Sequence, residues 1–177
     1  MIDEKIVHNK GFTLVELIIV ISVLAVLSIV GIAAFASYSR AQTLNAAAGD
    51  LAVMLNLAKS RAYSQIKPSQ CPDSIGSLDG YEVRICSSAS CTISGSGTSF
   101  ALFVTCGGAT RPPPISTANF SNSNLTFTSS SIPAVYSFFF PVLKGGVVGS
   151  GTITIGNTFG ETREVTVDVS GNIRIEK

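Results

Sequence analysis

Hydrophobic residues follow a different pattern in each of three parts of the chain. The first pattern is an apolar run from Leu17 to Ala36, twenty residues without a charge, Pro, Asn or Gln and interrupted only by Ser22 and Ser28. Twenty helical residues are roughly 30 Å long, about the thickness of the hydrocarbon core of a bilayer. The run therefore predicts a transmembrane helix over about residues 14–36. Lys5 and Lys10 precede it and favour a cytoplasmic N-terminus, with the rest of the chain outside.

The second pattern, over residues 37–66, is that of a helix with one apolar face. Its apolar residues recur at intervals of three or four positions. They are Leu44, Ala47, Ala48, Leu51, Met54, Leu55, Ala58, Ala62 and Ile66. Pro68 is a helix stop signal. With the apolar run, this pattern predicts one long helix over residues 12–66 that is amphipathic from residue 37.

The third pattern, over residues 67–177, is typical of short β-strands. β-Branched and aromatic residues dominate segments that Gly, Ser, Asn or Pro separate. The expected strands are Tyr81–Cys86, Phe100–Cys106, Leu125–Thr128, Val135–Phe140, Gly151–Ile155, Arg163–Val169 and Asn172–Glu176. Residues 111–114 (Arg-Pro-Pro-Pro) are expected to be an extended connection, and the Ser-rich runs 87–99 and 116–131 to be loops. Phe138–Phe140 is interpreted as a strand segment buried on both faces.

These patterns together predict an α+β fold. A long, partly transmembrane N-terminal helix packs on an all-β antiparallel head at residues 67–177. With 46% apolar residues and a net charge of +1, the composition excludes ordinary disorder and gives no overall basic field for nucleic acid.

The composition also argues against an enzyme. His8 is the only histidine, and the seven acidic residues of the head have no spacing typical of an acid–base pair or a metal site. Residues 145–151 are rich in glycine but lack the Lys-Ser/Thr of a phosphate loop, so a hairpin connection is the better interpretation. We therefore expect no catalytic residues, no metal and no cofactor.

Four cysteines, Cys71, Cys86, Cys91 and Cys106, lie in the head. In an exported domain disulfides are expected, and no C-x-x-C pair favours zinc. Three pairings are open. If Tyr81–Cys86 and Phe100–Cys106 form an antiparallel hairpin, then Cys71 reaches Cys106 at one end and Cys86 pairs with Cys91 at the other. We favour this nested pairing.

The residues that open the apolar run carry a more specific signal. A short charged leader is followed by Lys10-Gly11-Phe12-Thr13-Leu14-Val15-Glu16-Leu17. This segment resembles the prepilin processing site of type IV pilins and type II secretion pseudopilins. The resemblance implies a leader at residues 1–11, cleavage between Gly11 and Phe12 by a membrane peptidase, and N-methylation of Phe12.

Two other interpretations of the run are a permanent single-pass anchor and an ordinary signal peptide. Ala34-Phe35-Ala36 has the small-x-small form of a signal-peptide cleavage site, but the apolar core before it is too long. Neither interpretation accounts for the residues that open the run.

Glu16 needs a physical explanation, because a carboxylate inside a membrane helix is costly. One interpretation leaves it hydrated at the cytoplasmic interface. The other, which the resemblance supports, pairs Glu16 with the Phe12 amine of a neighbouring subunit. A subunit in the wrong register would then leave a buried charge unpaired.

Two further segments resemble a branch of this family, the GspH/FimT-like minor pilins and pseudopilins. Residues 49–64 resemble the second half of their helix, and residues 169–175 resemble their closing hairpin. The resemblance implies a non-enzymatic subunit of a type IV pilus or a type II secretion pseudopilus, with a role in assembly, priming or the tip. Its partners would be other pilin or pseudopilin subunits, the prepilin peptidase, the assembly platform of the inner membrane and the lipid bilayer. Its head would be periplasmic or extracellular.

A DNA-uptake receptor is the alternative function. FimT-like receptors carry Gly-Arg-x-Arg in the closing hairpin, whereas the stretch here is Gly171-Asn172-Ile173-Arg174. Arg174 is thus the candidate DNA contact, unless the fold gathers Arg84, Arg111 and Arg163 beside it. A neutral head with few cations releases few counterions, so we expect weak duplex binding and consider nucleic acid an improbable partner.

Overall fold

The computed structural model of the chain describes residues 11–86, 93, 99–120, 124–127 and 135–176, without the side chains of residues 29–31 and 33. The expected leader, residues 1–10, lies outside them. The chain divides into two compact units, Met1–Arg40 and Ala41–Lys177, of which the second contains the head.

One helix, α1, extends from Leu14 to Ser64. It ends where Gln65 takes a positive φ of 52°, a conformation typical of the residue that closes a helix, and Pro68 follows shortly after. The expected helix over residues 12–66 is therefore two residues too long at each end. Ile66 lies beyond the helix, and its carbonyl oxygen accepts a hydrogen bond from the Tyr81 hydroxyl.

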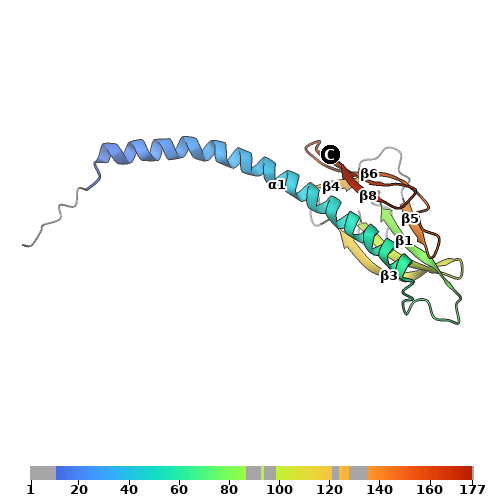
Figure 1. Ribbon diagram of the computed structural model, residues 1–177. Helices are drawn as coiled ribbons and strands as arrows, with labels where there is room; N and C mark the ends of the chain where they lie inside the picture. The colour runs from blue at the N-terminus through green and yellow to red at the C-terminus, as the bar shows by residue number, and fades with distance from the viewer. Residues whose placement is uncertain (1–10, 87–92, 94–98, 121–123, 128–134, 177) are drawn as a thin grey trace, which may run out of the picture. The chain divides into compact units, whose positions relative to one another are not determined.

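Within the second unit, the apolar face of α1 lies against the strands (Figure 1). The expected apolar residues from Leu44 to Ala62 are all buried, whereas Ile66 is exposed. They join one hydrophobic core with side chains from both sheets, such as Tyr81, Phe138, Ile153 and Val165. Both sheets of the head thus pack against the amphipathic half of the helix.

The described strands form two four-stranded antiparallel sheets. The first sheet has the order β3-β2-β1-β5, and the second has the order β4-β6-β7-β8. The strand bounds are β1 Leu78–Cys86, β2 Ser99–Cys106, β3 Ala109–Asn119, β4 Leu125–Phe127, β5 Val135–Pro141, β6 Gly151–Asn157, β7 Thr162–Val167 and β8 Ile173–Glu176. The expected all-β antiparallel head is therefore confirmed, and the ends of the seven expected strands agree with the observed ones to within three residues.

Three expectations for the head were wrong. Residues 111–114 are part of β3, and residues 116–119 of the expected loop belong to the same strand. β3 is an edge strand with a register shift where it pairs with residues 102–104 of β2, and edges and bulges are where a sheet tolerates proline. Phe139 was expected to be buried, but only Phe138 and Phe140 are. Phe139 lies on the other face, where its ring covers Gly80 so closely that a Cβ there would collide with it.

The segment between β5 and β6 connects the two sheets. Val148 exchanges two backbone hydrogen bonds with Phe139 at the edge of the first sheet, and the Val147 amide donates to the carbonyl of Val169, just after β7. Gly146 allows this approach, because its φ is +76° and a Cβ there would lie 2.7 Å from the Val169 carbonyl oxygen. The Gly-rich run is thus a structural connection between sheets.

A polar network lies on the outer face of the first sheet. Glu82 Oε2 accepts hydrogen bonds from Arg84 Nη2 at 2.9 Å and from Thr110 Oγ1 at 2.8 Å. The Arg84 guanidinium also lies over the Phe103 ring, 5.1 Å from its centroid. Burial raises the pKa of Glu82, but the hydrogen bonds from Arg84 and Thr110 and the charge of Arg84 outweigh it, so this pKa lies below its ordinary value of 4.5.

The lowered pKa of Glu82 gives a pH-dependent stability. Since the folded-state pKa is depressed, the stabilisation is complete above pH 4.5 and is lost as the pH falls through the folded value. Glu82→Gln should lower the free energy of unfolding by about 1 kcal/mol at pH 7, and by progressively less toward pH 3. Urea unfolding at pH 7, 5 and 3 measures this. Glu176→Gln, at the exposed edge of β8, is the control and should change stability by less than about 0.5 kcal/mol. If Glu82→Gln lowered the free energy of unfolding equally at every pH, the lowered pKa of Glu82 would be contradicted.

Candidate processing and assembly site

The expected cleavage site lies in exposed, non-helical chain. Gly11, Phe12 and Thr13 precede α1 and take no regular secondary structure, and the Phe12 side chain is 80% exposed. A peptidase must bind the scissile segment in an extended form, which a bond inside a helix does not offer without unwinding. The Gly11–Phe12 bond is thus accessible, and it stands immediately before the residue that starts the helix.

Thr13 sets the start of the helix. Its Oγ1 accepts a hydrogen bond from the backbone N–H of Glu16 at 3.2 Å, and its carbonyl oxygen accepts one from the Leu17 N–H at 3.1 Å. Thr13 is therefore an N-cap and Glu16 is in the first turn, where the helix dipole favours a negative charge. Sequence reasoning missed Thr13, although a Thr followed three residues later by Glu is a known signature of a helix start.

Large apolar side chains surround the helix after this first turn. Between Leu14 and Leu27 they are 47–74% exposed, on every side of α1. A helix that is apolar on all sides is typical of one that packs against lipid or other protein. Among the residues that the structure describes, no helix meets the length and hydropathy required to cross a membrane.

The described cysteines of the head lie at the two ends of β1. Cys71 and Cys106 form a disulfide bond, both are buried, and the pair is the one that the hairpin argument favours. β1 and β2 pair antiparallel with Leu78 opposite Cys106, which places Cys106 near the chain that leaves α1. Cys86 is disulfide-bonded as well, and Cys91, the partner expected for it, lies outside the described residues.

The Cys71–Cys106 bond should contribute substantially to stability. It joins residues 35 positions apart and so restricts the unfolded chain. Replacing both residues by Ala should lower the free energy of unfolding by about 2–4 kcal/mol, measured by urea unfolding of the oxidised protein. Peptide mapping without reductant provides the control, because the variant must retain the other bond. If the free energy of unfolding fell by less than about 0.5 kcal/mol, the Cys71–Cys106 bond would not contribute measurably to the stability of the head.

The candidate DNA-binding arginines are distributed over both sheets. Arg174 is exposed on β8, opposite Thr166 of β7. Arg84 is hydrogen-bonded to Glu82, Arg111 donates to the Cys106 carbonyl oxygen, and Arg163 donates to Asn45 on α1. Each of these three serves a local contact, and Arg84 and Arg111 belong to the first sheet, whereas Arg163 and Arg174 belong to the second.

The described residues contain no group of three or more His, Cys, Asp or Glu that would hold a metal ion. The Asp168 carboxylate is occupied in the turn between β7 and β8, where the Asn172 backbone N–H donates to Oδ1 at 2.9 Å and the Asn172 side chain to Oδ2 at 3.1 Å. The hydrogen bonds from Asn172 lower the pKa of Asp168, although burial acts in the opposite direction. The turn is further held by Lys59 Nζ, which donates to the Gly171 carbonyl oxygen at 2.8 Å.

Comparison with protein families gives one result. Residues 7–35 match the family model described as the prokaryotic N-terminal methylation motif. Comparisons with curated proteins and with solved structures gave no match. The matched segment includes Gly11, Phe12, Thr13 and Glu16, the residues that stand before and within the first turn of α1.

The motif and the architecture define a class of protein. A long N-terminal helix packs on antiparallel β-sheets, which is the pilin-like α+β fold, and an N-methylation motif opens that helix. The chain is therefore a type IV pilin- or pseudopilin-like protein, and its motif implies a prepilin with an N-terminal membrane anchor.

Proposed function

We propose that this protein is a minor pilin or pseudopilin, a structural subunit in the assembly, priming or tip of a type IV pilus or a type II secretion pseudopilus. The observation that carries the proposal is the Gly11–Phe12 bond, exposed and non-helical directly before a capped helix that bears Glu16. The apolar face of the same helix forms part of the hydrophobic core of the β-rich head. Cleavage at the Gly11–Phe12 bond would therefore leave the helix attached to a folded head. In this proposal the protein acts through assembly.

The branch of the family that we propose is the GspH/FimT-like one. It is supported by the helix over residues 49–64, whose apolar face is buried against both sheets, and by the closing hairpin of β7 and β8. The dispersal of the arginines favours a structural subunit over a DNA receptor, because phosphate binding requires several cations on one surface.

The proposed location is the inner membrane. The uncharged run Leu17–Ala36 would anchor the subunit with its N-terminus in the cytoplasm and its head in the periplasm, where the disulfides are stable. The peptidase, the assembly platform and other subunits would meet it there, and the subunit would leave the bilayer on entering a filament.

The processing step can be tested directly. We expect the protein isolated from its native membrane to begin at Phe12 and to carry one N-methyl group, because the peptidase would cleave after Gly11. Intact mass spectrometry measures both. Gly11→Val, which adds a branched side chain beside the scissile bond, should leave the full-length chain uncleaved. Conservative replacement of a leader residue, Ile6→Val, is the matched control and should be processed normally.

Two outcomes would refute this proposal. A mature chain that begins at Ser37 would identify an ordinary secretory signal peptide. A chain that retains residues 1–11 in cells with an active prepilin peptidase would identify a permanently anchored protein.

A further inference from the structure

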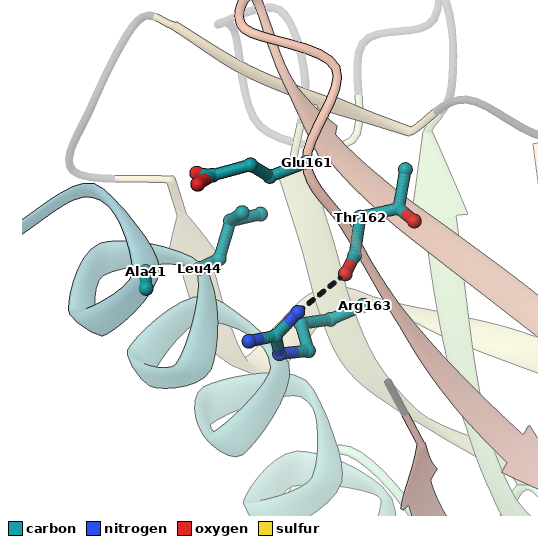
Figure 2. A pocket seen from close by; sticks show the side chains of 5 residues that line it. All are labelled: Ala41, Leu44, Glu161, Thr162 and Arg163. Atoms are coloured by element: carbon teal, nitrogen blue, oxygen red, sulfur yellow. Dashed lines mark hydrogen bonds between the residues drawn. The ribbon is translucent and has the colours of Figure 1, made fainter. Parts of the chain in front are cut away.

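A pocket with a volume of about 340 Å³ lies between α1 and the hairpin of β6 and β7. It is lined by Ala41, Leu44, Glu161, Thr162 and Arg163 (Figure 2). All five belong to the second unit, and the helix residues and the hairpin residues are more than a hundred positions apart in the sequence. Neither the motif nor the proposed function uses this pocket.

Two opposite charges line the pocket without neutralising each other. Arg163 Nε donates to Asn45 Oδ1 and Nη1 donates to the Thr162 carbonyl oxygen, both at 2.7 Å, which fixes the guanidinium and leaves Nη2 available among the described contacts. Glu161 Oε2 accepts from Asn157 Nδ2 at 2.8 Å. In the described part of the chain no ion pair joins Glu161 to Arg163, and Leu44 lies between them in Figure 2.

The turn that leads into the pocket residue Glu161 carries an exposed aromatic side chain, Phe159. Asn157 Oδ1 accepts hydrogen bonds from the backbone N–H groups of Phe159 at 2.9 Å and of Glu161 at 3.0 Å. Gly160 completes the turn with a φ of +83°. The turn presents Phe159, which is 62% exposed, two residues before Glu161. A backbone held in this way loses little conformational entropy when the turn enters an interface.

The pocket lies close in the chain to the end of the apolar run. Ala41 is five residues after Ala36, and five residues span at most about 18 Å when fully extended. This maximal distance is set by the length of the chain between Ala36 and Ala41 and by nothing else. If residues 17–36 fill the hydrocarbon layer, the pocket lies within reach of the headgroup layer, where aromatic side chains are enriched.

We propose that this pocket binds the headgroup of a zwitterionic phospholipid that has a primary ammonium group, a phosphoethanolamine lipid. The Arg163 guanidinium would bind the phosphate, Glu161 would accept a hydrogen bond from the ammonium, and Phe159 would enter the interface beside them. A trimethylammonium headgroup has no N–H to donate to Glu161, and a headgroup with only a phosphate leaves Glu161 without a cation. The inference rests on the proposed membrane anchor.

The absence of tryptophan allows a clean test with the full chain. Phe159→Trp places one fluorophore two residues before Glu161, and Val169→Trp places one at another exposed position, beyond the far end of β7. Each variant is reconstituted in vesicles of phosphatidylethanolamine and phosphatidylcholine, of which one or the other is brominated to quench nearby tryptophan. Flotation with the vesicles reports the anchor independently.

We expect the Phe159→Trp emission to shift to the blue and the Val169→Trp emission to stay that of water. Quenching of Phe159→Trp should be roughly threefold stronger by brominated phosphatidylethanolamine than by brominated phosphatidylcholine, the preference expected of one exposed ion pair. Adding Glu161→Gln should remove this preference, and adding Arg163→Gln should weaken quenching by both lipids.

Three outcomes would overturn the inference. If the chain floats with the vesicles and both tryptophans emit alike, the pocket does not bind lipid, and the proposed function is untouched. If the blue shift disappears as the protein is diluted in excess lipid, the pocket binds a neighbouring subunit instead. If the chain does not float, the proposed anchor fails and the headgroup site fails with it.

Discussion

Leu55→Ala should lower the free energy of unfolding of the head by about 2–5 kcal/mol. Leu55 is fully buried in the core that α1 shares with both sheets. Its removal takes apolar surface out of the core and leaves a cavity that a helix and two sheets cannot readily close. Near-UV circular dichroism of the tyrosines during urea unfolding in detergent follows the head, since Tyr81 is buried in the same core.

Val53→Ala is the matched control for this prediction. Val53 lies on the same helix, two residues away, but its side chain is 67% exposed. Its replacement should change the free energy of unfolding by less than about 0.5 kcal/mol. Equal effects of the two substitutions would mean that the helix does not hold the head together through its apolar face, which would contradict the core described above.

The helix was predictable from sequence because one physical rule dominates it. Residues that recur every three or four positions form a face, and a face that is apolar must be buried against something. Every residue of that face from Leu44 to Ala62 is in the core. The ends were less predictable, because Gln65 closes the helix through a backbone conformation that Gln rarely takes and that no sequence pattern indicates.

The strand with the prolines shows where local reasoning fails. Pro112, Pro113 and Pro114 lack the N–H group that a central strand needs, and so they argue against a strand. β3 forms nevertheless, because it pairs with β2 along one edge only and has an irregular register there. Whether a segment lies at an edge is decided by the whole sheet, and so is the division of the strands into two sheets.

The candidate site was predictable only where its residues are neighbours in sequence. Gly11, Phe12 and Glu16 lie within six consecutive residues, and their pattern is specific enough to predict the site without the structure. The pocket lined by Arg163 and Ala41 is the opposite case, since only the packing of the β6–β7 hairpin on α1 brings those residues together. A single arginine in a predicted strand does not indicate which distant residues will lie beside it.

Glu16→Ala should reduce incorporation of the subunit into filaments by about tenfold or more, while cleavage at Gly11 continues. A neighbouring Phe12 amine that loses its carboxylate is left as an uncompensated charge, which costs about 3–5 kcal/mol in an apolar environment. Glu16→Gln keeps the size and removes the charge, so it should behave like Glu16→Ala. The measurement is the fraction of the subunit in sheared filaments relative to the membrane, in cells that also contain the other subunits.

The structure supplies a control that separates the charge of Glu16 from its place in the helix. Thr13 Oγ1 accepts a hydrogen bond from the backbone N–H of residue 16, which both Glu16→Ala and Glu16→Gln retain. Thr13→Ala removes this bond and should destabilise the start of the helix by about 1 kcal/mol, with Glu16 unchanged. If the charge selects the neighbour, Thr13→Ala is incorporated far better than Glu16→Ala. If both variants are incorporated equally poorly, the two residues act only by starting the helix. Normal incorporation of Glu16→Ala would instead place Glu16 at the hydrated interface, with no part in choosing a neighbour.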